Sequence, residues 1–218
     1  MTQSVVSEIS NNLMFRYRMP CLPIKQDAKK PVHLPATHDL PDFCSMDGGG
    51  SIAMLRAAWG ESGMYFTVVV ENKKQSLWCK RTQLLDSDGM QLWIDTRDTH
   101  NLHRATKFCH WFLVLPQGDG PGEKQPLATM LKINRAREHS PTINQAKIPT
   151  DSKVTRTGYT LSMYIPGPVL NGWNPEEHKH LGFCYSVRDR ELGLQHLSVG
   201  SEYPVAEDPS LWHTLVLG

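Results

Sequence analysis

The stretch IAMLRAAWGESGMYFTVVV at residues 52–70 decides the fold. Its second half, residues 64–70, is dense in β-branched and aromatic side chains, which favour the extended backbone of a half-buried sheet. The letters GESG at 60–63 indicate a turn between this run and the apolar run at 52–59. The stretch therefore predicts a β-hairpin.

The same pattern of short apolar runs separated by turn residues continues along the chain. At 89–96 the letters GMQLWIDT alternate, with residues 90, 92 and 94 on one face and residues 91, 93 and 95 on the other. Further strands are expected at 15–24, 107–115, 130–133, 154–156, 158–165, 181–188, 194–199 and 211–217. No amphipathic pattern of ten or more residues predicts a helix, although 168–173 fits one helical turn. We predict an all-β fold, a two-sheet antiparallel β-sandwich or jelly roll.

Residues 1–50 form an irregular N-terminal arm in this prediction, and residues 51–218 form the sandwich. The run at 15–24 reads as an edge strand, because Pro20 and Pro23 cannot donate ladder hydrogen bonds. Residues 25–50 are rich in Pro, Asp and Gly, which is typical of a long irregular connection. We expect the arm to belong to the same domain as the sandwich.

The composition excludes several classes of protein. The chain has 218 residues, 39% of them hydrophobic, which is enough for a core. Its 23 Lys+Arg and 22 Asp+Glu give a net charge of +1, which is not that of a generally basic nucleic-acid binder. No apolar run approaches the ~20 residues that a membrane-spanning helix needs. We therefore expect neither nucleic acid nor a membrane as a partner.

The cysteines and the N-terminal residues favour a cytoplasmic location. The five cysteines contain no CxxC pair, and their number is odd, unlike the dense even sets of small disulfide scaffolds. The first twelve residues show no charged segment followed by an apolar one, so no secretory signal is recognised. We expect reduced thiols and a cytoplasmic protein.

Four short motifs, in order, resemble the family 9 carbohydrate-binding module and its related β-sandwich domains. They are AWGESGMYF at 58–66, DGMQLWID at 88–95, GYTLSMYIP at 158–166 and LGF to VRD at 181–189. The ending DPSLWHTL at 208–215 also fits. The resemblance implies a β-sandwich, and it implies non-catalytic binding of a saccharide or similar polar ligand on one sheet face.

The resemblance also carries residues of the family's sugar site onto this chain. The family's Glu in the second motif falls on Gln91, and its Arg in the following strand falls near His110. Its polar pair in the fourth motif falls on Ser186 and Arg188, which lie two residues apart and so on one sheet face.

The two tryptophans with which the family stacks a sugar are absent from this chain. Their positions fall near Leu85 and Ala206, and Trp78 and Tyr203 are the nearby aromatic residues that could substitute. The expected carbohydrate-binding residues are therefore Trp78, Gln91, His110, Ser186, Arg188 and Tyr203. No cofactor and no metal is expected.

Alternative interpretations remain open at the sequence level. His100, His103 and His110 could hold a metal in a hydrolase, since imidazole is a common zinc ligand, or the charged run at 95–104 could pin a loop with salt bridges. His110 could equally be a core histidine. Trp93 and Trp111 could be packing residues, and residues 188–191 could form a solvated turn. The domain could also be an interaction module that has lost sugar binding.

No motif for catalysis is present. The sequence lacks a Gly-x-Ser-x-Gly elbow, a phosphate loop and a dinucleotide fingerprint. We therefore expect a binding protein rather than an enzyme. The sequence does not indicate an oligomeric state.

Overall fold

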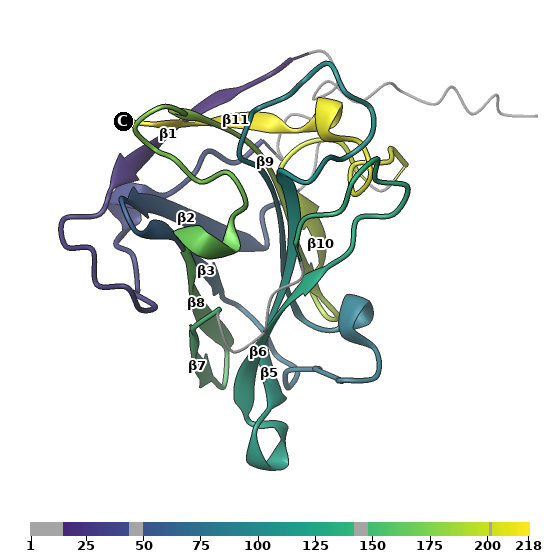
Figure 1. Ribbon diagram of the computed structural model, residues 1–218. Coiled ribbons are helices and arrows are strands. Elements are labelled where there is room, and N and C mark those ends of the chain that lie inside the picture. Colours follow the sequence, from purple (N-terminus) through teal and green to yellow (C-terminus); the bar gives the residue numbers. More distant parts are fainter. Residues whose placement is uncertain (1–14, 44–49, 142–147, 201) are drawn as a thin grey trace, which may run out of the picture.

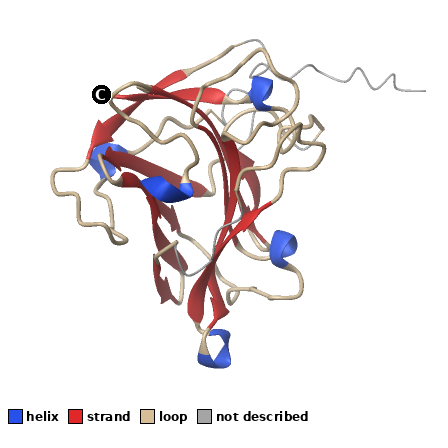
Figure 2. Ribbon diagram, in the orientation of Figure 1, coloured by secondary structure: helices blue, strands red, loops and turns tan. Residues whose placement is uncertain are grey.

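The computed structural model describes residues 15–43, 50–141, 148–200 and 202–218, and strands dominate it (Figure 2). Its helical segments are 3-10 turns of three residues, such as Gly167–Val169 at the predicted helical turn. The strands are β1 (Arg18–Pro23), β2 (Ala53–Gly60), β3 (Gly63–Val70), β4 (Gly89–Asp95), β5 (Cys109–Asp119), β6 (Gln125–Leu131), β7 (Thr150–Thr155), β8 (Gly158–Pro166), β9 (His180–Asp189), β10 (Gly193–His196) and β11 (His213–Leu217).

The strands form one folded sheet rather than two separate ones. Their order is β6-β5-β4-β9-β11-β1-β2-β3-β8-β7, with β10 paired to β9 (Figure 1). We call β4, β5, β6, β9, β10 and β11 the β4 half, and β2, β3, β7 and β8 the β3 half. The predicted all-β class is confirmed, but the division into two antiparallel sheets is not, because β1 joins the halves.

β1 makes this junction by changing partners along its length. Residues 18–21 pair in parallel with β11, and Leu22 and Pro23 pair in parallel with β2. Each part of β1 therefore has a single neighbouring strand, which accommodates prolines that cannot donate a ladder hydrogen bond. Pairing within each half is antiparallel.

The hydrophobic core lies between the two halves. Phe66 of β3 and Phe183 of β9 stack across it, with ring centroids 5.7 Å apart and planes at 2°. Both rings are fully buried. On the far side, Ser152 in β7 donates a hydrogen bond of 2.7 Å to the carbonyl of Pro116 in β5, so the folded sheet nearly closes on itself.

The hairpin predicted at 52–70 is confirmed. β2 and β3 pair from Ala53 opposite Val70 to Gly60 opposite Gly63, which leaves a two-residue loop. Gly63 has a φ of +153°, and a Cβ at this position would lie 2.1 Å from the carbonyl oxygen of Ile165. Only glycine fits such close contact with β8.

The hairpin loop between β5 and β6 is short. Residues 117–126 are rich in Gly and Pro, but β5 continues to Asp119, which pairs with Gln125. The register shifts between Leu115 and Asp119, which accommodates Pro116 inside the strand.

The N-terminal arm covers the outer face of the β3 half. Leu34, 1% exposed, packs with Tyr65 and Tyr164 in a small cluster, and its backbone N–H donates to Thr67 Oγ1 at 3.1 Å. Arg56 Nε of β2 binds Asp39 Oδ1 of the arm at 2.6 Å. These contacts join the arm to the sheet. The first twelve residues, in which no secretory signal is recognised, lie outside the described residues.

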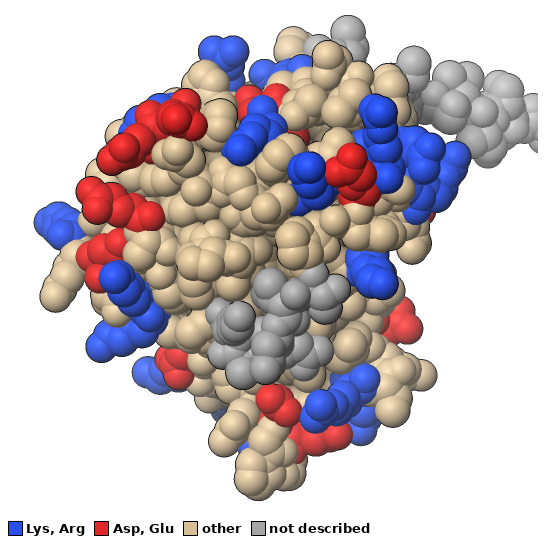
Figure 3. Space-filling model, in the orientation of Figure 1, with Lys and Arg blue, Asp and Glu red and all other residues tan. Residues whose placement is uncertain are grey.

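Charged side chains of both signs are interspersed on the face seen in Figure 3. This distribution agrees with the net charge of +1. In the part of the chain that the structure describes, no helix is long and apolar enough to cross a membrane.

Candidate functional site

Backbone pairing brings three of the expected sugar-binding residues onto one surface of the β4 half. Gln91 in β4 pairs with Ser186 in β9, which pairs in turn with His196 in β10. Arg188 lies two residues farther along β9, so it is on the same side of the sheet. We use the name Gln91 face for the surface formed by Gln91, Trp93, Trp111, Ser186, Arg188 and His196.

Two tryptophans lie beside Gln91 on this face. Trp93 of β4 is paired with Trp111 of β5, and their rings stack with centroids 5.7 Å apart and planes at 19°. The indole N–H of Trp111 donates to Gln91 Oε1 at 3.1 Å. Within the described residues the Gln91 amide nitrogen has no acceptor, so this N–H₂ group is left for a ligand or water.

Three residues of the Gln91 face are more exposed than its two tryptophans. Trp93 and Trp111 are 4% and 9% exposed, and Ser186 is 2% exposed. Gln91, Arg188 and His196 are only half-buried. The two tryptophans therefore pack the sheet, while Gln91, Arg188 and His196 keep part of their surface exposed.

His110 lies on the opposite side of the sheet from Gln91, Ser186 and Arg188. It neighbours Phe112, with the two rings stacked at 6.1 Å, and it is 1% exposed. The backbone N–H of Asn171 donates to its Nε2 at 2.9 Å. Burial lowers the pKa of His110 to about 4. His110 is thus a neutral core histidine with a structural partner, and it is not part of the Gln91 face.

The two aromatic residues expected to replace the family's tryptophans are half-buried and lie in loops. The backbone of Trp78 is tied to Asp88, just before β4, and the Arg190 guanidinium lies 4.8 Å from its ring centroid. Tyr203 lies in the segment between β10 and β11 and packs against the core. No contact places either ring against Gln91.

The three histidines of the metal hypothesis make separate contacts. His100 Nε2 lies 2.7 Å from Asp98 Oδ1, the exposed His103 binds Asp208 at 3.0 Å, and His110 is in the core. Among the residues described, no group of three or more His, Cys, Asp or Glu is arranged to hold a metal. The geometry gives the metal-dependent hydrolase no support.

The charged run at 95–104 forms a pinned loop, although no salt bridge joins its Arg97 or Arg104 to Asp95 or Asp98 in the described structure. Asp95 accepts the backbone N–H groups of Arg97 at 2.9 Å and Thr99 at 2.7 Å. The Arg97 guanidinium lies 4.4 Å from the Phe108 ring centroid and donates to the Gly172 carbonyl. The run therefore holds one end of β4 against the 171–173 segment.

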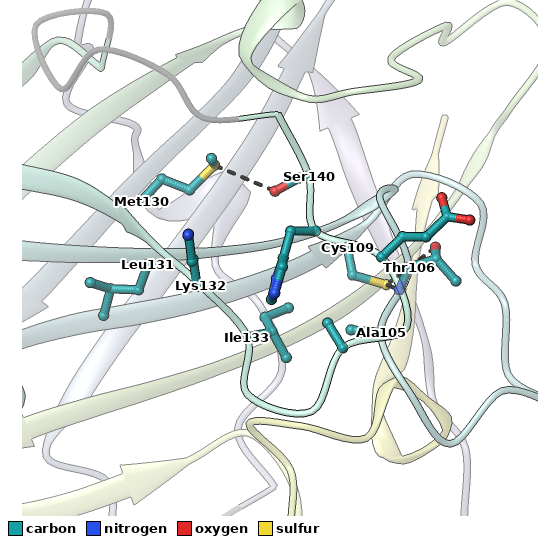
Figure 4. A pocket seen from close by; sticks show the side chains of 11 residues that line it. Ala105, Thr106, Cys109, Met130, Leu131, Lys132, Ile133 and Ser140 are labelled. Carbon is teal, nitrogen blue, oxygen red and sulfur yellow. Dashed lines mark hydrogen bonds between the residues drawn. The ribbon is translucent and has the colours of Figure 1, made fainter.

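A small cavity borders the Gln91 face on its β5–β6 side. Figure 4 shows Cys109, Leu131 and Ile133 among its lining side chains. The cavity measures about 80 Å³, whereas pockets for small ligands typically enclose ~300 Å³ or more. Burial raises the pKa of the Cys109 thiol to about 12, so this thiol is not a nucleophile at neutral pH.

A larger hollow lies elsewhere, beside β8. It is an open groove of about 600 Å³ lined by Lys29, Tyr164, Asn171 and Trp173, among others. Trp173 stays half-exposed, and its indole N–H donates to the Glu61 carbonyl at 3.0 Å.

Sequence reasoning did not place Trp111 and His196 on the Gln91 face. Alternation in β5 puts Trp111 on one side and His110 on the other, but only the pairing of Trp93 with Trp111 shows which side faces Gln91. His196 joins through the β9–β10 hairpin, whose register puts it opposite Ser186. The alternation was visible in the sequence, and the register was not.

Two of the solved structures that share this fold are family 9 carbohydrate-binding modules. A family 9 module from Caldicellulosiruptor kristjanssonii in complex with glucose matches 93% of this chain and 96% of its own, at 11% identity and a TM-score of 0.61. A family 9 module from the same organism in complex with cellotriose also matches. The match covers 92% of this chain and 93% of that module, at 11% identity and a TM-score of 0.59.

A proposed carbohydrate-binding protein from Bacteroides uniformis also matches. It covers 94% of this chain and 100% of its own, at 10% identity and a TM-score of 0.55. No protein-family model matches the chain, and a search of curated proteins gives no match. The resemblance to family 9 modules that the sequence indicated is therefore confirmed for the fold.

Proposed function

We propose that this protein binds a saccharide without catalysis, on the Gln91 face. The observation that carries the proposal is the cross-strand row of Gln91, Ser186 and His196 with Arg188 beside it. A planar amide, a hydroxyl, an imidazole and a guanidinium on rigid strands can orient the hydroxyl groups of a sugar ring.

The fold comparisons support this proposal independently of the residues. Modules with this architecture bind glucose and cellotriose. The folded sheet fits a β-sandwich of that kind whose two leaves are joined by β1. Trp78 and Tyr203 are the aromatic residues that we propose to contact the sugar ring, because both are half-buried and lie in loops.

We further propose that the protein acts in a reducing compartment, the cytoplasm. Cys21, Cys79, Cys109 and Cys184 are free thiols. Cell fractionation tests the location, and recovery of the protein outside the cytoplasm would contradict it.

A glycan array followed by calorimetry tests the function. We expect binding to at least one saccharide, and we expect Gln91→Ala to weaken it about tenfold, as for the loss of a hydrogen bond in a binding site. The matched control is Gln125→Ala, which truncates an exposed glutamine at the β5–β6 hairpin. A folded protein that binds no glycan, or equal loss in both variants, would contradict the proposal.

The groove beside β8 provides the competing arm of this test. If the sugar stacks there, Trp173→Ala abolishes binding and Gln91→Ala leaves it unchanged. That outcome would move the site away from the Gln91 face.

A further inference from the structure

Arg188 is a half-buried guanidinium that lacks a counter-charge within the described chain. Its Nε is buried and has no hydrogen-bond partner among these residues, and no ion pair involves its other nitrogens. Its cross-strand neighbours are Gly89, which has no side chain, and the apolar Leu194. Arg188 thus presents five N–H donors beside Gln91. The side chains paired with it on β4 and β10 supply no acceptor for these donors.

The other groups of the Gln91 face are also mainly donors. Oε1 of Gln91 is already used by the Trp111 indole, so the accessible part of this side chain is its N–H₂ group. The indole N–H of Trp93 is buried without a partner in the described structure. A neutral sugar presents hydroxyl groups that need acceptors as well as donors, whereas the Gln91 N–H₂, the Trp93 indole and the Arg188 guanidinium offer donors only.

No ion pair in the described structure joins Arg188 to a neighbouring titratable group. Burial lowers the pKa of His196, Glu202 raises it and Arg188 lowers it, with a net downward shift, so His196 is neutral at pH 7. Glu202, the acidic group near His196, is exposed, and its carboxylate accepts the Gly200 N–H at 3.2 Å. A positive charge surrounded by donors favours a ligand that brings anionic oxygens.

We propose that the saccharide bound by the Gln91 face is acidic, and that its carboxylate or sulfate group pairs with Arg188. This inference rests on the proposed function and specifies the ligand class. A planar guanidinium can hold two anionic oxygens at once, while the Gln91 amide donates to a neighbouring oxygen of the sugar.

Calorimetry with three matched probes tests the proposal: glucose, glucuronate and glucose 6-sulfate. They share the same ring and differ only at carbon 6, which is attached to it, so a difference in affinity reports on that substituent. We expect at least one anionic probe to bind about tenfold more tightly than glucose at low salt, and this preference to shrink as salt is raised. Comparing the two anionic probes shows whether carboxylate or sulfate is preferred.

Variants of Arg188 assign the effect to this residue. Arg188→Gln should remove the preference for the anionic probe, and Arg188→Lys should retain part of it, because lysine keeps the charge without the bidentate geometry. Arg81→Gln is the control, since it changes the net charge equally at an exposed position.

The outcomes separate this inference from the proposed function. If glucose binds as tightly as the anionic probes, and Gln91→Ala weakens all three while Arg188→Gln weakens none, the acidic-ligand inference is overturned and saccharide binding stands. If the folded protein binds no saccharide at all, both are overturned. Equal loss in Arg188→Gln and Arg81→Gln would show a general charge effect and would also refute the pairing.

Discussion

At the residue scale, sheet alternation decides which side chains can act together. His110 and Trp111 are neighbours in sequence, yet one faces the core and the other faces Gln91. The core position explains the hydrogen bond from Asn171 to His110 Nε2, which requires a neutral ring. A site chosen by residue type alone would include His110. Its position on the core side of the sheet excludes it from the Gln91 face.

Neutral buried histidines predict a loss of stability in acid. Burial lowers the pKa of His110 to about 4, and burial with nearby Arg16 and His100 lowers that of His213 to about 4. The unfolded chain has pKa values near 6.5 for histidine and binds these protons first, so the free energy of unfolding falls as pH drops from about 6.5 towards 4. The full shift at His110 corresponds to roughly 3 kcal/mol.

Urea unfolding at pH 7 and pH 5 measures this effect. His110→Gln keeps an uncharged acceptor and should lose less stability between the two pH values than the unmodified protein. Histidine NMR should show the His110 ring still neutral at pH 5.5. Protonation of that ring near pH 6.5 would refute the assignment.

At the element scale, the start of β4 and the end of β9 are held together by a buried ion cluster. Lys73 lies 3.3 Å from Asp88 Oδ2 and also contacts Asp189 Oδ2, and all three residues are buried. The two carboxylates also accept backbone N–H groups, those of Trp78 and Arg190 at Asp88 and that of Leu192 at Asp189. The cluster therefore fixes the loops at the Arg188 end of the Gln91 face.

Removing the cation from this cluster should destabilise the fold strongly. Lys73→Met leaves two buried carboxylates without a counter-charge, a change that typically costs ~3–5 kcal/mol. The exposed neighbour Lys74→Met should change the free energy of unfolding by less than ~0.5 kcal/mol. Chemical denaturation compares them, and equal stability of the two variants would contradict the structural role of Lys73.

The hairpin at 53–70 was predictable from local residues, whereas the partners of β1 were not. A turn between two apolar runs is a local signal. The parallel pairing of β1 with β11, by contrast, joins residues nearly 200 positions apart, such as Arg18 and Thr214. The same limit applied to the site: the sequence indicated Gln91, Ser186 and Arg188, while Trp111 and His196 depended on long-range register.

At the scale of the whole molecule, the N-terminal arm and the sheet share contacts that should make them unfold together. β1 connects the two halves, and Leu34 packs against the outer face of the β3 half. Domain boundaries normally fall where few contacts cross, and many contacts cross between the arm and the sheet.

Shortening a buried side chain of the arm tests whether the arm and the sheet unfold together. Leu34→Ala should lower the free energy of unfolding by ~2–4 kcal/mol, with tryptophan fluorescence and far-ultraviolet circular dichroism shifting together. Leu22→Ala, at a position 43% exposed, is the control and should have a small effect. Separate transitions for the two signals would show that the arm unfolds independently.

Nuclear magnetic resonance of the side-chain N–H groups tests the central claim most directly. With glucose and then glucuronate titrated into ¹⁵N-labelled protein, we expect the Gln91 amide, the Trp111 indole and the Arg188 Nε signals to shift together and to saturate. Unchanged signals at these three residues, with shifts confined to the Trp173 indole, would contradict binding on the Gln91 face.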